Sequence, residues 1–209
     1  MVGLLGANGA GKTTLFDVIC GLRKQADGCV FTSDTKCGIA YLPQAITVPD
    51  ALKLGEVVDL VLGVSGANKH QLDSLLVEEP ERVRSRFKQL LTRRGNNCSY
   101  GEKRWLIVML MLAMDASVYL LDEPTAGVDL EFRYFMFTTL KRLAAQKKSV
   151  LFATHIVQEI EQYADCFYLL HDGKARRFES SGEFIALAKA STMEEAFVRH
   201  ISDGGLVGV

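Results

Sequence analysis

The chain has 209 residues, a length that suits one domain with a sizeable hydrophobic core. Its 24 Lys and Arg against 25 Asp and Glu leave a net charge of −1. The chain therefore lacks the excess of basic residues that would indicate a nucleic-acid partner. The five cysteines lack CxxC spacing, which favours reduced thiols over zinc or disulfides, and the longest apolar run, 106–114, is far shorter than the ~20 residues that span a bilayer.

The first predicted element is an apolar strand at 2–5, and a helix is predicted over 12–22. Between them the sequence fits GxxxxGK[ST], the phosphate-binding loop, and the strand–loop–helix context is the one that this motif requires. Lys12 would reach the β- and γ-phosphates of a nucleoside triphosphate, and the Thr13 hydroxyl would bind Mg²⁺. The candidate phosphate-binding residues are Gly6, Ala7, Asn8, Gly9, Ala10, Gly11, Lys12, Thr13 and Thr14.

Further apolar runs predict strands at 38–42, 118–121, 150–154 and 166–170. Helical patterns separate them, and this alternation predicts an α/β fold with a mainly parallel sheet. The predicted helices span 102–114, 130–146 and 156–164.

The segment from about 45 to 98 has a different pattern, with amphipathic helical stripes such as Leu54, Val57 and Val58. We predict that it forms a helical lobe inserted into a sheet core made of 1–43 and 115–209. Cys29–Phe31 is interpreted as a remnant of a reduced antiparallel flank.

Near the end of the chain, turn and cap signals predict the last elements. Asp172-Gly173 predicts a hairpin between 167–171 and 174–178. Thr192 followed by Glu195 predicts a capping box that opens a last helix, through about Ile201, before a frayed tail at 204–209.

Polar residues at two strand ends supply the other half of a nucleotide site. Asp122 and Glu123 follow the apolar strand at 118–121, where an acid can hold Mg²⁺ and its neighbour can polarise a water for attack on the γ-phosphate. His155 ends the next strand, where it either binds the γ-phosphate or is an ordinary polar residue. Ser99-Tyr100-Gly101-Glu102 predicts a capped helix start that can also recognise phosphate.

In this order, the motifs resemble the ATP-binding cassette (ABC) family over nearly the whole chain. They are the phosphate loop, Gln44, the helical lobe, Ser99–Glu102, Asp122-Glu123, Ala126–Asp129 and His155. The resemblance implies a single ABC ATPase domain over 1–209 with a P-loop NTPase core. It also implies ATP and Mg²⁺ as ligands, and a head-to-tail dimer, either a homodimer or a pair with a second cassette.

The resemblance also implies a role for each motif residue. Thr13, Asp122 and Gln44 would serve Mg²⁺, Glu123 would be the general base, and His155 would steady the γ-phosphate. Across the dimer, Ser99 and Gly101 would contact the ATP of the partner cassette, and Asp129 would lie in the loop that communicates with it. Gln44 would also sense integral membrane permease subunits, which would place the chain on the cytoplasmic face of the membrane.

Three departures from the family pattern stand out. Cys98, Tyr100 and Glu102 replace three of the five usual Leu-Ser-Gly-Gly-Gln residues, and Ala126 replaces a serine. The chain also begins directly on the loop strand, without the upstream segment whose aromatic side chain stacks on adenine. We therefore expect either a truncated or misassigned start, or a degenerate cassette that binds ATP weakly.

The favoured interpretation is an ATP-binding and ATP-hydrolysing subunit that drives transport through separate membrane subunits, with a sequence closer to exporter-type cassettes. The alternatives are a soluble non-transport ABC ATPase and a truncated cassette without turnover. A P-loop kinase or GTPase accounts poorly for Ser99–Glu102 and His155, and no guanine-reading Asn-Lys-x-Asp is present.

Overall fold

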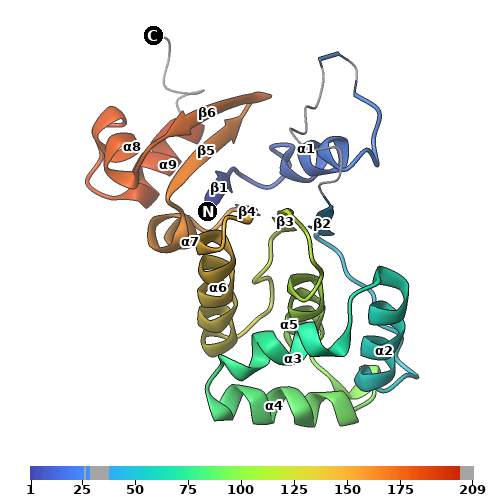
Figure 1. Cartoon of the computed structure of the whole chain (residues 1–209). Coiled ribbons are helices and arrows are strands. Elements are labelled where there is room, and N and C mark those ends of the chain that lie inside the picture. Colours follow the sequence, from blue (N-terminus) through green and yellow to red (C-terminus); the bar gives the residue numbers. More distant parts are fainter. Residues whose placement is uncertain (26, 29–37, 203–209) are drawn as a thin grey trace. The chain divides into compact units, whose positions relative to one another are not determined.

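The computed structural model describes residues 1–25, 27–28 and 38–202, which form two compact units. The first unit lies within 1–31, 120–123 and 150–209, and the second within 32–119 and 124–149. Figure 1 shows the chain coloured along the sequence. The predicted strand remnant Cys29–Phe31 and the tail 204–209 lie outside the described residues.

A mainly parallel sheet forms the centre of the first unit. β1 (Val2–Leu5) pairs in parallel with β4 (Ser149–Thr154) on one side and with β5 (Cys166–His171) on the other. β6 (Lys174–Phe178) adds an antiparallel strand to β5, and the end of β3 (Val118–Asp122) lies next to β4. The predicted α/β class with a mainly parallel sheet is therefore confirmed.

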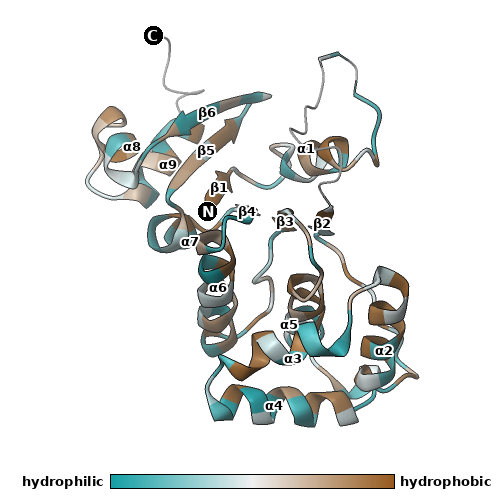
Figure 2. Ribbon diagram, viewed as in Figure 1, coloured by the Kyte–Doolittle hydropathy of each residue, from teal (hydrophilic) through white to brown (hydrophobic). Residues whose placement is uncertain are grey.

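The strands differ in hydropathy according to their place in this sheet. Figure 2 shows β1 and β5 as largely hydrophobic, as expected of strands covered on both faces, whereas β6 carries Lys174, Arg176 and Arg177 at the edge. The turn between β5 and β6 has Asp172 at φ 46° and Gly173 at φ 72°. Two left-handed residues are what a two-residue type I′ hairpin requires, so the predicted hairpin is confirmed.

The first unit also contains α1 (Lys12–Ile19), α7 (Val157–Tyr163), α8 (Ser181–Leu187) and α9 (Met193–Ser202). Helix α1 ends earlier than the predicted 12–22, because Gly21 adopts a left-handed φ of 72° that terminates the helix. The short helix α8 was not predicted from the sequence.

The predicted capping box of α9 is displaced by one residue. The Thr192 hydroxyl accepts the Glu195 N–H at 3.1 Å, as expected. The Glu195 carboxylate, however, accepts the N–H of Ser191 at 2.7 Å and not that of Thr192. The helix start is capped from both directions, with the acid reaching one residue further back.

The second unit is mostly helical. Its helices α2 and α4 pack side by side, and α5 packs on α6 and on β2. β2 also neighbours the start of β3, where the Gly38 carbonyl accepts the N–H of Ser117 at 3.0 Å. The elements are β2 (Ile39–Leu42), α2 (Leu54–Ser65), α3 (Lys69–Val77), α4 (Glu81–Thr92), the 3-10 helix η1 (Gly95–Asn97), α5 (Tyr100–Leu112) and α6 (Leu130–Ala145).

Aromatic packing joins three of these helices. Trp105 of α5 stacks on Phe132 of α6 with ring centroids 4.1 Å apart, and Phe87 of α4 meets Trp105 edge-on at 5.3 Å. The helical character predicted for about 45–98 is observed in α2, α3 and α4, although α3 was not individually predicted. The predicted division into a sheet core of 1–43 and 115–209 and an inserted lobe stays a prediction.

Candidate functional site

The loop between β1 and α1 has the backbone shape that the phosphate-loop motif predicts. Gly9 and Gly11 adopt left-handed φ values of 82° and 102°, which glycine reaches without strain. A Cβ at Gly6 would lie 2.8 Å from the carbonyl oxygen of Leu170, so no larger residue fits there without a shift. The loop ends at the start of α1, where the first N–H groups have no intrahelical acceptor and favour an anion.

Lys12 reaches back across this loop. Its buried ammonium donates hydrogen bonds to the carbonyls of Gly6 at 2.8 Å and Ala7 at 3.2 Å. It also lies 3.5 Å from Oε1 of Glu123. The charge is thus fixed at the mouth of the loop, where the phosphates of a bound nucleotide would lie.

Thr13 and Asp122 meet from opposite ends of the sequence. The Thr13 hydroxyl donates to Oδ2 of Asp122, which is fully buried at the end of β3. A hydroxyl beside a carboxylate offers the oxygen ligands that Mg²⁺ prefers, so the pair fits the metal predicted for it. Within the described residues no cluster of three His, Cys, Asp or Glu side chains could hold a metal alone. Mg²⁺ usually binds one or two protein carboxylates together with phosphate oxygens, so Thr13 and Asp122 would hold it jointly with a bound nucleotide.

Glu123 is the meeting point of the cluster. Its Oε1 lies 2.9 Å from Nδ1 of His155 as well as near Lys12, and its N–H donates to the carbonyl of Ala153 at 2.9 Å. Its φ of 50° is left-handed, which costs a non-glycine residue about 1 kcal/mol or more and is often retained at functional sites. The first unit therefore brings together five predicted residues: Lys12, Thr13, Asp122, Glu123 and His155.

Beyond these five and the remaining loop residues, the predicted site residues lie in the second unit: Gln44, Ser99, Gly101 and Asp129. Ser99 is the N-cap of α5: its hydroxyl accepts the Glu102 N–H at 3.1 Å, and the Glu102 carboxylate accepts the Ser99 N–H at 2.9 Å. The predicted capping box is therefore confirmed. Burial raises the pKa of Glu102, but the Ser99 N–H and the guanidinium of Arg93, 2.6 Å away, outweigh it and lower the pKa below its ordinary value.

Gly101 and Asp129 bring the start of α5 against the loop that precedes α6. A Cβ at Gly101 would lie 2.0 Å from the carbonyl oxygen of Gly127, so only glycine permits this approach. Asp129 caps α6 by accepting the Phe132 N–H at 3.0 Å. The side chains of Ser99 and Asp129 are thus both engaged in helix caps.

Arg104 is a structurally central residue that was not predicted from the sequence. Its side chain is 0% exposed, and it donates to the carbonyls of Gln44 at 2.9 Å and Pro124 at 3.1 Å. It also reaches the Pro43 carbonyl at 3.4 Å and the Tyr100 hydroxyl at 3.2 Å. Arg104 therefore joins the Gln44 segment, the turn after Glu123 and the start of α5. Its place one turn after Tyr100 was the only signal in the sequence.

The comparisons with known proteins agree with this geometry. The family model described as ABC transporter matches residues 1–126. The chain belongs to the ABC transporter family. Membership implies nucleotide binding and, in general terms, the ATPase activity of such cassettes.

Similar ABC proteins cover most of the chain. Protein McbF of Escherichia coli is 31% identical over 204 residues, spanning 96% of this chain and 83% of McbF. The lipopolysaccharide export system ATP-binding protein LptB of Acidithiobacillus ferridurans is 32% identical over 205 residues, or 88% of this chain and 80% of LptB. A solved ATP-binding subunit of an ABC transporter superposes with a TM-score of 0.78 over 95% of this chain and 86% of its own, at 24% identity, which shows the shared fold.

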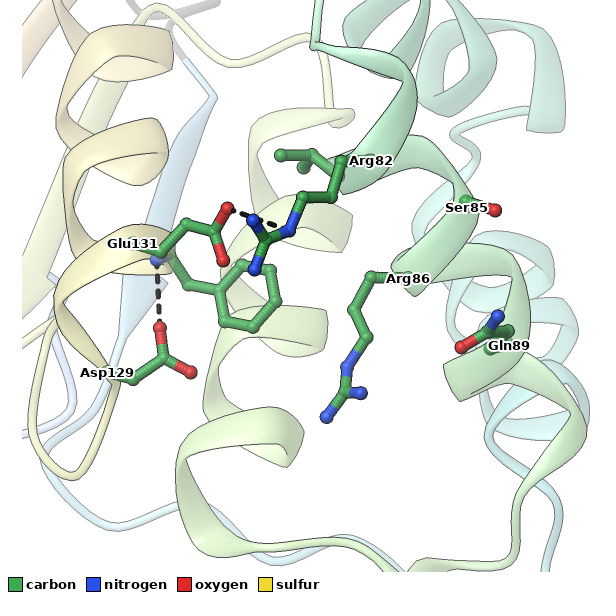
Figure 3. Close-up of a pocket in the computed structure, with 8 residues that line it drawn as sticks. Arg82, Ser85, Arg86, Gln89, Asp129 and Glu131 are labelled. Carbon is green, nitrogen blue, oxygen red and sulfur yellow. Dashed lines mark hydrogen bonds and ion pairs between the residues drawn. The ribbon is translucent and has the colours of Figure 1, made fainter.

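The second unit of this ABC cassette also carries a pocket of about 420 Å³ beside Asp129 (Figure 3). Arg82 of α4 pairs with Glu131 of α6 at 3.3 Å on its rim, and Arg86 and Gln89 line it from α4. Two arginines, Arg82 and Arg86, and two acids, Asp129 and Glu131, line the pocket, so their formal charges balance. In the described part of the chain, every helix is too short or too polar to cross a bilayer.

Proposed function

We propose that this chain binds ATP at residues 6–14 with Mg²⁺ at Thr13 and Asp122, hydrolyses the ATP, and works as a cassette of an ABC transporter. The observation that carries the proposal is the pairing of consecutive loop residues with consecutive acids: Thr13 with Asp122, and Lys12 with Glu123. A nucleoside triphosphate bound at the loop would place its γ-phosphate among these groups. Mg²⁺, when bound, would neutralise charge on the β- and γ-phosphates.

In the proposed reaction, Glu123 accepts a proton from a water whose oxygen attacks the γ-phosphorus in line. The bond from that phosphorus to the bridging oxygen breaks, and ADP leaves with the bonding electrons. Lys12 balances the charge that develops on the phosphate oxygens. His155, 2.9 Å from Glu123, orients the carboxylate and steadies the γ-phosphate.

The proposed assembly pairs two cassettes and docks them on integral membrane permease subunits at the cytoplasmic face of a membrane. Gln44, Ser99, Gly101 and Asp129 would act in it. Ser99 and Gly101 would contact the ATP of the partner cassette, and Asp129 would lie in the loop that communicates across the dimer. Family membership supports such an assembly in general terms. LptB, which is 32% identical, is named for an export system, which supports transport over a non-transport function.

The decisive experiment replaces Glu123 with Gln. A general base contributes about 10²- to 10⁴-fold, so phosphate release should fall by at least about 100-fold while a fluorescent ATP analogue still binds. Lys12→Ala should weaken binding of the analogue itself. Glu179→Gln is the matched control, because it makes the same change on an exposed carboxylate of the same unit and should leave turnover unchanged.

Wild-type turnover in Glu123→Gln would refute the proposed mechanism. The assembly has its own test: Glu123→Gln with ATP should elute as a dimer in size-exclusion chromatography with light scattering. In cells the chain should co-purify with a polytopic membrane protein, whereas co-purification with ribosomes or DNA would support a non-transport ABC protein.

A further inference from the structure

A buried threonine and a buried glutamate stand beside His155. Thr154, the last residue of β4, has a hydroxyl that donates to Oε2 of Glu159 at 2.8 Å. The same hydroxyl accepts the N–H of Ile156 at 3.0 Å. Thr154 is fully buried and Glu159 is 2% exposed, so neither side chain is placed to contact solvent or a nucleotide directly.

These bonds form a capping arrangement that spans His155. Helix α7 begins after Ile156, an apolar N-cap whose side chain makes no capping hydrogen bond. In an ordinary capping box the acid at the third helical position would accept the N-cap N–H directly. Here Glu159 holds that position, and the Thr154 hydroxyl stands between the acid and the amide. Because a hydroxyl can donate and accept at once, it ties the residue before His155 to the residue after it.

The His155 side chain itself is poorly held by packing. It is 48% exposed, and Nδ1 meets Oε1 of Glu123 at 2.9 Å. The direction of an exposed side chain depends on its backbone, so the two residues flanking His155 decide whether the ring reaches Glu123. Thr154 is also tied to the phosphate loop, because its carbonyl accepts the Gly6 N–H at 3.4 Å.

We propose that Thr154 and Glu159 are positioning residues, which hold His155 against Glu123 through the shared hydroxyl and thereby set the rate of ATP hydrolysis. The catalytic part of this proposal rests on the proposed function. The two residues touch neither nucleotide nor water in the reaction and act only through His155. Their loss should therefore lower kcat and leave the KM for ATP, which the loop residues set, unchanged.

The test is a double-mutant cycle of Thr154→Val with His155→Ala. Valine keeps the β-branched shape and removes the hydroxyl, so kcat should fall by about 3- to 10-fold, the range expected for one hydrogen bond. Thr154→Ser keeps the hydroxyl and should restore most of the rate. The variant with both changes should be no slower than His155→Ala, because in this proposal the hydroxyl acts on the reaction only through His155.

Thr139→Val is the matched control. The Thr139 hydroxyl also donates to a buried glutamate, Glu79, at 2.8 Å, but here Thr139 lies on α6 and Glu79 lies between α3 and α4, all in the second unit. Its loss should reduce stability without changing kcat of the folded chain. A Thr154→Val chain with wild-type kcat would overturn the proposal. So would a double variant that is slower than His155→Ala by the full factor seen for Thr154→Val alone.

A second readout does not depend on turnover. The imidazole ¹H–¹³C signal of His155, assigned by its loss in His155→Ala, should shift in Thr154→Val, return in Thr154→Ser and stay in place in Thr139→Val. An unshifted signal in Thr154→Val would overturn the positioning role even if the chain proved unable to hydrolyse ATP. Failure of the wild-type chain to hydrolyse ATP would refute the proposed function separately.

Discussion

Replacing Arg104 with Met should destabilise the second unit strongly. Methionine keeps an unbranched apolar side chain in the buried position but removes the guanidinium. The carbonyl of Pro124 loses the donor at 3.1 Å, and the carbonyl of Gln44 loses the donor at 2.9 Å while keeping the Tyr100 hydroxyl at 3.2 Å. The bond to Pro43 is long, at 3.4 Å, and contributes less.

The magnitude follows from these distances. Hydrogen bonds to a charged group contribute about 1.5–3 kcal/mol each, so losing the bonds to Pro124 and Gln44 costs roughly 3–6 kcal/mol. The Met variant also lacks the free-energy penalty of burying the guanidinium cation, and this offsets part of the loss. We therefore expect the free energy of unfolding to fall by about 2–4 kcal/mol.

The assay is urea denaturation followed by tryptophan fluorescence. Trp105 is the single tryptophan, lies next to Arg104 and is stacked on Phe132, so its emission reports on this part of the chain. Arg82→Met is the control: that side chain is 83% exposed and pairs with Glu131 at the surface, so about 0.5 kcal/mol or less is expected. A loss below about 1 kcal/mol in Arg104→Met would refute the structural role of Arg104.

The start of α5 gives two further predictions. Gly101→Ala should lower the free energy of unfolding by about 1–3 kcal/mol, because the added Cβ clashes with Gly127. Gly63→Ala is the control: it lies in a helix with open space around it and should not destabilise the chain. Equal effects of the two substitutions on stability would contradict the prediction. Because the pKa of Glu102 is lowered in the folded chain, its stabilisation is complete above the unfolded pKa of about 4.3 and is lost as pH falls through the folded pKa. Glu102→Gln should therefore be less stable than wild type at pH 7, and the difference in free energy of unfolding should shrink as pH falls through the lowered pKa. A difference that stays constant with pH in urea titrations would contradict this.

The sequence predicted the parts of this fold whose signals are local and strong. The apolar strands, the Asp172-Gly173 hairpin and the Ser99 capping box each follow from a few adjacent residues, and all were observed. The short helices α3 and α8 were missed because each buries few apolar side chains and shows little periodicity. Their caps were readable nonetheless: Asn68 with Gln71 forms a capping box, and Ser180 accepts the Glu183 N–H.

Side chains that act over long distances in the sequence were harder to predict. Arg104 binds carbonyls 20 and 60 residues away. Because every residue has a backbone carbonyl, the identities of the accepting residues do not reveal these bonds. Glu159 was not predicted as a positioning residue, because a glutamate in the first turn of a helix is common at exposed positions. Only burial distinguishes it.

The backbone conformation at Glu123 explains how two consecutive acids, Asp122 and Glu123, both face the phosphate loop. Neighbouring residues on a strand point to opposite faces, so Asp122 and Glu123 in a continuous strand could not both face one loop. The left-handed φ of 50° at Glu123 ends that alternation, and the bond from its N–H to Ala153 holds the turn against β4. The two carboxylates then reach Thr13 and Lys12, which are themselves consecutive. A strained residue here aligns two acids with two loop residues, an arrangement that a regular strand cannot provide.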